Sequence, residues 1–112
     1  MLRLRSIDEQ DIPLLLKWFN DREDTKYMED PVDVYTYEYL KERINKDSYD
    51  FVALLDDKPI GFCSIYNAKD GTGEISILIG DKEYRGRGYG EEVLREICNY
   101  GFGLLLFKEL FA

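Results

Sequence analysis

Residues 83–92 form a glycine-rich segment, EYRGRGYGEE, whose residue types could bind a phosphate group. Its basic residues and glycines are Arg85, Gly86, Arg87, Gly88 and Gly90. Glycine lets the backbone approach a ligand closely and adopt a positive φ. A helix that starts here would add unpaired N–H groups and a partial positive charge. The segment therefore predicts an anion site of the strand–loop–helix type.

Two common phosphate motifs do not fit this segment. The P-loop needs a lysine followed by serine or threonine after its last glycine, and none is present. The dinucleotide fingerprint GxGxxG fails because its last position is Glu91 when counted from Gly86 and Val93 when counted from Gly88. The alternative without a ligand is a glycine-rich turn with solvated arginines.

The flanking segments have the periodicity of elements that would position the loop. Residues 74–79 alternate like a strand, with the isoleucines on one face and Glu74, Ser76 and Leu78 on the other. Apolar residues after the loop follow helical spacing. The expected helical stripe is Val93, Leu94, Ile97, Cys98 and Gly101. A further strand is expected to begin at 108–112, parallel to 74–79 because a crossover helix joins the two.

The first half of the chain predicts a strand, two helices and a hairpin. Residues 2–7 alternate like a short strand, and Asp8 or Ser6 can cap the helix that follows. A second helix is expected at about 36–45. The remaining predictions are strands at 51–55 and 60–66 around the turn DDKP, and a loop at 67–73. The fold class is therefore α/β (α+β), with a mixed, mostly antiparallel sheet flanked by helices.

Composition limits the chemistry that the chain can perform. The 112 residues suit one domain, and a net charge of −8 argues against a nucleic-acid partner. Because histidine is absent, a general base must be a carboxylate, a tyrosine, a free amine or water. Cys63 and Cys98 lie in apolar patterns without metal-site spacing, so free thiols and no metal are expected. Apolar runs are too short for a membrane span, and a soluble, cytoplasmic protein is expected.

The register Arg85-x-x-Gly88-x-Gly90 resembles the signature of the GNAT (Gcn5-related N-acetyltransferase) superfamily. In that family the signature lies between the fourth strand and the third helix. The segment EISILIGDKEYRGRGYGEEVL resembles the family core, and DDKPIGFCSIY resembles its first hairpin. The opening LRLRSIDEQDIPLLLKWFND resembles the RimJ/RimL-type branch. The resemblance covers essentially residues 1–112, in the right order.

The resemblance implies a direct acetyl transfer from acetyl-CoA to a primary amine, such as a protein N-terminus or a polyamine. Backbone amides from Arg85 to Gly90, including those of Gly86, Arg87, Gly88 and Tyr89, would hold the pyrophosphate. Leu78 and Ile79 would pair with the pantetheine arm, and an amide near Ile79 would bind the oxyanion. Glu74 is the candidate base, acting through water, and its alternative role is a surface carboxylate at a strand end. Acidic residues of the 20–35 loop would then suit a cationic acceptor.

The family domain normally continues with another helix and a hairpin, which supply a tyrosine that protonates the leaving thiolate. Three readings compete here: a truncated product, a domain completed by a second copy, and a non-catalytic acyl-CoA-binding module. An exposed edge at the C-terminal strand would favour pairing with another copy, as a homodimer. The acceptor amine and the general acid are left open.

Overall fold

A five-stranded sheet in the order β1-β2-β3-β4-β5 forms the centre of the computed structural model, which describes residues 1–20, 36–44, 46, 48–105 and 107–111. Its strands are β1 (Leu2–Ser6), β2 (Ser48–Leu55), β3 (Lys58–Lys69), β4 (Thr72–Ile79) and β5 (Glu109–Phe111). Strands β1 to β4 are antiparallel to their neighbours, and β5 runs parallel to β4. The predicted mixed, mostly antiparallel sheet is confirmed.

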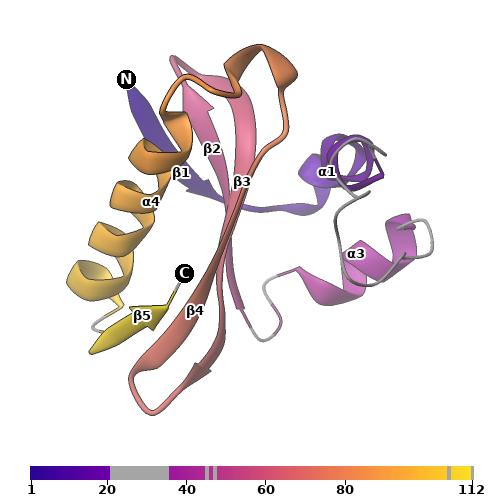
Figure 1. The fold of residues 1–112 in the computed structure, drawn as a ribbon. Helices are drawn as coiled ribbons and strands as arrows, with labels where there is room; N and C mark the ends of the chain where they lie inside the picture. The colour runs from indigo at the N-terminus through magenta and orange to yellow at the C-terminus, as the bar shows by residue number, and fades with distance from the viewer. Residues whose placement is uncertain (21–35, 45, 47, 106, 112) are drawn as a thin grey trace.

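Helices cover both faces of the sheet (Figure 1). They are α1 (Ile12–Phe19) and α3 (Tyr37–Arg43) on one face, and α4 (Tyr89–Asn99) on the other. Short 3-10 turns stand at Glu9–Asp11 and Lys82–Tyr84, and α4 continues into a π-helical turn, Tyr100–Leu104. The predicted element order is therefore confirmed. No helix in the described part of the chain is long and apolar enough to cross a membrane.

The core has two apolar layers because alternate strand residues point to opposite faces. On the α4 side the buried residues are Phe51, Ala53, Ile60, Cys63, Ile65, Ile75, Val93 and Ile97. On the other side they are Ile7, Ile12, Leu15, Trp18, Leu40, Val52 and Leu54. Both cysteines are free thiols, as expected. Burial raises the pKa of Cys63 to about 12, so this thiol is unreactive at neutral pH.

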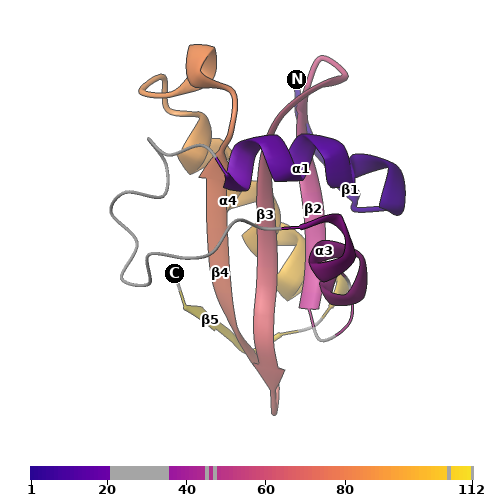
Figure 2. The same cartoon turned by 90° about the vertical axis from the view of Figure 1, so that its right-hand side faces the viewer.

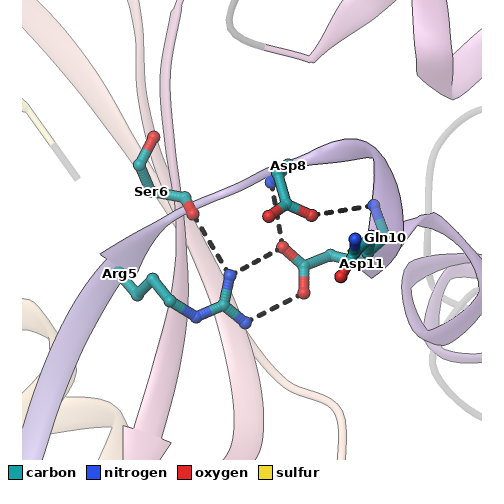
Figure 3. Close-up of polar contacts among 5 residues, drawn as sticks. All are labelled: Arg5, Ser6, Asp8, Gln10 and Asp11. Atoms are coloured by element: carbon teal, nitrogen blue, oxygen red, sulfur yellow. Dashed lines mark hydrogen bonds and ion pairs between the residues drawn. The ribbon is translucent and has the colours of Figure 1, made fainter.

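Polar contacts fix the turn between β1 and α1 (Figure 3). Asp8, rather than Ser6, is the cap, because its carboxylate accepts a hydrogen bond from the Gln10 amide at 2.8 Å. The Arg5 guanidinium donates two hydrogen bonds of 2.9 Å to the Asp11 carboxylate, which also accepts from the Asp8 amide. Hydrogen bonding by Arg5 holds the pKa of Asp11 below its usual range. The entry into α1 is thus tied to the sheet.

The expected loop at 67–73 is wrong for most of its length. Strand β3 runs to Lys69 and β4 starts at Thr72, which pairs directly with Lys69. Asn67 and Asp70 adopt positive φ angles of 51° and 54°. These turn-forming residues make a bulge and a tight turn within a continuous hairpin. Their composition is typical of a loop, although the strands on both sides remain hydrogen-bonded to each other.

Trp18 packs directly on the backbone where β4 ends. A Cβ atom added at Gly80 would lie only 2.1 Å from Cδ2 of the indole. Glycine is needed there because any side chain would overlap the ring. The close approach fixes α1 against the first residue of the glycine-rich connection.

Candidate functional site

The predicted anion loop forms the N-terminal end of α4. Gly86 and Gly88 have positive φ angles of 73° and 84°, and Gly88 is the residue that precedes the first helical turn. No side chain caps this end of the helix. The first N–H groups of α4 therefore lack the side-chain acceptor that usually satisfies one of them. The helix dipole adds a partial positive charge at the same place.

The space over this helix end is open. Apart from its chain neighbours and its own helix backbone, a Cβ atom added at Gly86, Gly88 or Gly90 would meet no atom of the described residues within 4 Å, in contrast to Gly80. Positive φ explains glycine at Gly86 and Gly88, whereas neither strain nor crowding explains Gly90. A polyanion can therefore approach the backbone amides without displacing protein atoms. The residues present fit a pyrophosphate.

The two arginines of the loop have different environments. The Arg85 side chain donates to the carbonyl oxygens of Ile79 at 2.7 Å and of Gly80 at 3.2 Å. It thereby fastens the loop to the end of β4, while its positive charge stays close to the helix end. Arg87 is exposed to solvent. The Tyr89 ring packs edge-on against Tyr84, with 5.7 Å between centroids.

Strand β4 has an open edge beside the glycine loop. Strand β5 pairs only with Thr72, Gly73 and Glu74, and Figure 2 shows it diverging from β4. No described strand pairs with that edge over residues 75–79. Leu78 and Ile79, the predicted partners of an extended ligand, lie there half-buried. An extended chain can add to such an edge by main-chain hydrogen bonds.

Glu74 lies at the other end of β4, roughly 16 Å from Ile79 at the usual strand rise. Its carboxylate is exposed and accepts a hydrogen bond from the Asn67 side-chain amide. Register places Glu74 opposite Tyr66, and Ser76 opposite Ser64. The strand thus carries Glu74 and Ser76 on the face covered by α1 and α3, as expected from the alternation.

A cavity of about 500 Å³ lies between α1, α3 and strands β2 and β3. The sequence analysis did not identify Asp50, a buried polar residue of this cavity that is only 6% exposed. Ser64 donates to Asp50 at 2.6 Å, and Ser48 donates at 2.9 and 3.0 Å. The spacing of Asp50 could have identified it. Asp50 lies two residues before Val52 in the same strand, so both side chains point to the same face, where Val52 is buried.

The predicted acidic residues of the acceptor loop lie outside the described residues. They are Asp21, Glu23, Asp24, Glu29, Asp30 and Asp33.

Comparison with known proteins identifies related domains. Residues 1–112 match the family model described as an acetyltransferase (GNAT) domain. A spermidine N-acetyltransferase from Vibrio cholerae, solved with CoA and spermine, is similar at a TM-score of 0.80 and 22% identity. The similarity covers 95% of this chain and 66% of that one, so the chain spans just under two thirds of that enzyme. A search of curated proteins finds no match.

Two further structures share the fold. A domain from Methanocaldococcus jannaschii DSM 2661 has a TM-score of 0.83 and 18% identity, over 98% of this chain and 75% of that one. The aminoglycoside acetyltransferase AAC(6')-Ib, solved with coenzyme A, has a TM-score of 0.76 and 20% identity, over 91% and 68%. At these identities the similarity establishes the fold alone.

Proposed function

Because the GNAT domain model matches residues 1–112, the chain belongs to this acetyltransferase family, and we propose that it transfers an acetyl group from acetyl-CoA to a primary amine. Within the family, its opening segment favours the RimJ/RimL-type branch. Spermine and coenzyme A are bound in one structural neighbour, and coenzyme A in another, which supports an amine acceptor and a CoA donor.

The observation that carries the proposal is the open helix end at Gly86, Gly88 and Gly90. Three glycines face empty space, two of them have positive φ, and the helix N-terminus lacks a side-chain cap. A pyrophosphate there would accept hydrogen bonds from the amides of residues 85–90. Arg85 and Arg87 would add positive charge that a polyanion needs.

The open edge of β4 supports the placement of the acyl arm. Pantetheine carries amide groups, and residues 75–79 offer a strand edge that no described strand covers. Leu78 and Ile79 would pair with it and would bring the thioester next to the sheet face that bears Ser76. A backbone amide near Ile79 would then stabilise the oxyanion that forms on the thioester oxygen.

The amine must lose a proton before it can attack. Glu74 would accept this proton through a chain of water molecules, because roughly 16 Å of strand separate its backbone from that of Ile79. The neutral nitrogen attacks the thioester carbonyl carbon, the carbon–sulfur bond breaks, and the sulfur leaves as a thiolate. The nitrogen loses its second proton, and the thiolate gains one. In sum, an ammonium and a thioester give an acetamide, a thiol and one released proton.

Calorimetric titration of the purified chain with acetyl-CoA tests the first half of the proposal, and thiol release across a panel of amines tests the second. Saturable binding with amine-dependent thiol release is expected. Binding without turnover for any amine would instead favour a non-catalytic acyl-CoA-binding module. Absence of binding by a folded chain would overturn the assignment of the glycine loop.

A further inference from the structure

We propose that Arg85 sets the register in which the acyl arm of the donor binds to the open edge of β4, so that it is a positioning residue as well as a source of positive charge. The inference rests on the proposed binding of acetyl-CoA and adds a residue role to it. It starts from the hydrogen bond that Arg85 Nε donates to the carbonyl oxygen of Ile79 at 2.7 Å.

The turn before β4 shows which backbone groups of the strand face its open edge. The carbonyl oxygen of Gly71 points toward β5, where it accepts hydrogen bonds from the amides of Lys108 at 2.6 Å and Glu109 at 3.3 Å. Along a strand, the backbone groups of successive residues point alternately to the two neighbouring strands. The register of β4 is unbroken against β5 over 72–74 and against β3 over 74–79. Odd-numbered residues of β4 therefore direct their N–H and C=O groups toward the edge.

The other end of the strand gives the same assignment. The carbonyl oxygen of Ile60 in β3 accepts a hydrogen bond from the Asp81 amide at 3.1 Å, so Ile60 faces β4. Phe62 has the same parity as Ile60, and it lies opposite Leu78. Leu78 therefore directs its backbone groups toward β3, and an added chain would pass it between two hydrogen-bonding positions. The following residue, Ile79, directs its groups toward the edge.

The edge that an added chain would meet is short. Strand β5 pairs with β4 no further than Glu74, and no other described strand covers the rest. The edge-directed groups beyond that point belong to Ile75, Ile77 and Ile79. At Ile79 the carbonyl oxygen already accepts the Arg85 hydrogen bond, which leaves the N–H to bind a ligand.

Arg85 therefore ends the ladder at Ile79. Its Nε takes the place of the next N–H donor of an added chain, and its guanidinium also donates to the carbonyl oxygen of Gly80 at 3.2 Å. Without Arg85, an amide N–H of pantetheine could bond to the Ile79 carbonyl instead of the Ile77 carbonyl. Such a shift by two residues would move the arm by roughly 7 Å along the strand and would misplace the thioester.

The atom that donates the hydrogen bond allows the donor to be separated from the charge. Counted along the side chain, arginine Nε and glutamine Nε2 occupy the same position, so Arg85→Gln can keep the bond to Ile79 without a charge. Arg85→Met has neither the donor nor the charge. Arg85→Lys keeps the charge but places a methylene group at the position of Nε. Every other contact of the guanidinium is lost in both neutral variants, so their difference isolates the donor.

Steady-state kinetics and calorimetry with acetyl-CoA test the role of Arg85. A donor bound in the shifted register adds to binding but does not react. Relative to Arg85→Gln, Arg85→Met should therefore lower kcat and the Kd of acetyl-CoA together, each by about fivefold for one added net hydrogen bond. Arg85→Lys should also have a lower kcat than the wild type. Arg95→Met, which removes an exposed arginine further along α4, is the matched control and should leave both constants unchanged.

The outcomes that contradict the inference are specific. Equal kcat values in the two neutral variants would overturn it. A higher Kd in Arg85→Met than in Arg85→Gln would overturn it as well, because loss of a merely structural contact weakens binding. Wild-type turnover in Arg85→Lys would show that the charge matters and the donor does not. Thermal unfolding checks that each variant is folded, and where Arg85→Met is not, the comparison of Arg85→Gln with Arg85→Lys decides.

Amide hydrogen exchange tests the backbone directions without turnover. Bound coenzyme A should slow exchange at Ile79 by at least about tenfold and leave Leu78 unchanged, because the Leu78 amide is already directed to β3. Slowing at Leu78 alone would refute the assigned edge. If coenzyme A binds but no amine reacts, the proposed acetyl transfer fails, while exchange and the Kd values of the neutral variants still test the register.

Discussion

Replacing Gly90 with glutamate should abolish coenzyme binding without harming the fold. Gly90 lies in the first turn of α4 and has no positive φ, and an added Cβ would meet no atom of the described residues outside its own helix within 4 Å. Glutamate is a better helix former than glycine by about 0.5–1 kcal/mol. Its charge is also favourable near a helix N-terminus, by about 0.3–1 kcal/mol. The free energy of unfolding should therefore stay constant or rise.

The same carboxylate should repel a bound pyrophosphate. Helical side chains lean toward the N-terminus, so the carboxylate would project toward the open space over the helix end. At about 5 Å, with an effective dielectric constant near 20, one pair of like charges costs about 3 kcal/mol. That energy corresponds to about 100-fold weaker binding for each phosphate charge at that distance.

Calorimetry with acetyl-CoA measures the Kd, and thermal unfolding measures stability. Gly90→Ala is the matched control, because the methyl group fits the open space without adding charge. It should bind acetyl-CoA nearly as the wild type does, while Gly90→Glu should lose at least about 100-fold in affinity. A folded Gly90→Glu variant with an unchanged Kd would refute the placement of the pyrophosphate at α4.

Three further predictions concern the base, the packing and the ion pair. Glu74→Gln should lower kcat by about 10²–10⁴-fold while the calorimetric Kd of acetyl-CoA stays constant, and an unchanged kcat would exclude Glu74 as the base. Gly80→Ala should destabilise the fold by about 1–3 kcal/mol in denaturant titrations, because its methyl group would overlap Trp18, and full stability would contradict the contact. Asp11→Asn should cost about 1–3 kcal/mol at neutral pH through loss of the Arg5 hydrogen bonds. Because the pKa of Asp11 is lowered in the fold, that contribution is present above its unfolded pKa and is lost as the pH falls through the lowered value. Wild-type and variant stabilities should therefore converge in acid, and a difference that persists there would contradict the ion pair.

Most of the fold could be predicted because its elements have strong periodicity and clear ends. The stripe through Val93 and Ile97 and the alternation of residues 74–79 each allowed one assignment, and the structure confirms both. The bulge at Asn67 could not be predicted, because asparagine serves equally in loops and in irregular strands. Strand β2 also begins earlier than predicted, at Ser48.

The glycine loop of the candidate site could be predicted from the sequence, whereas the cavity around Asp50 could not. The loop at residues 83–92 could be predicted because its glycines and arginines are adjacent in the sequence. Asp50 and Ser64 are far apart in the chain and meet only through the register of β2 and β3. A register shift between Ala53 and Leu54 makes that pairing harder to infer from alternation. The cavity around Asp50 could therefore be identified only from the structure.

The contact between Trp18 and Gly80 joins helix α1 to the connection that leads into the glycine loop. Trp18 belongs to α1, which also lines the cavity around Asp50 through Leu15 and Phe19, and Gly80 begins the connection to the glycine loop. A ligand that moved one of these elements relative to the other would change this contact, and any coupling that followed would be reciprocal. Trp18 is also the single tryptophan of the sequence. Its fluorescence is therefore a direct optical probe of this contact, and of any ligand that changes it.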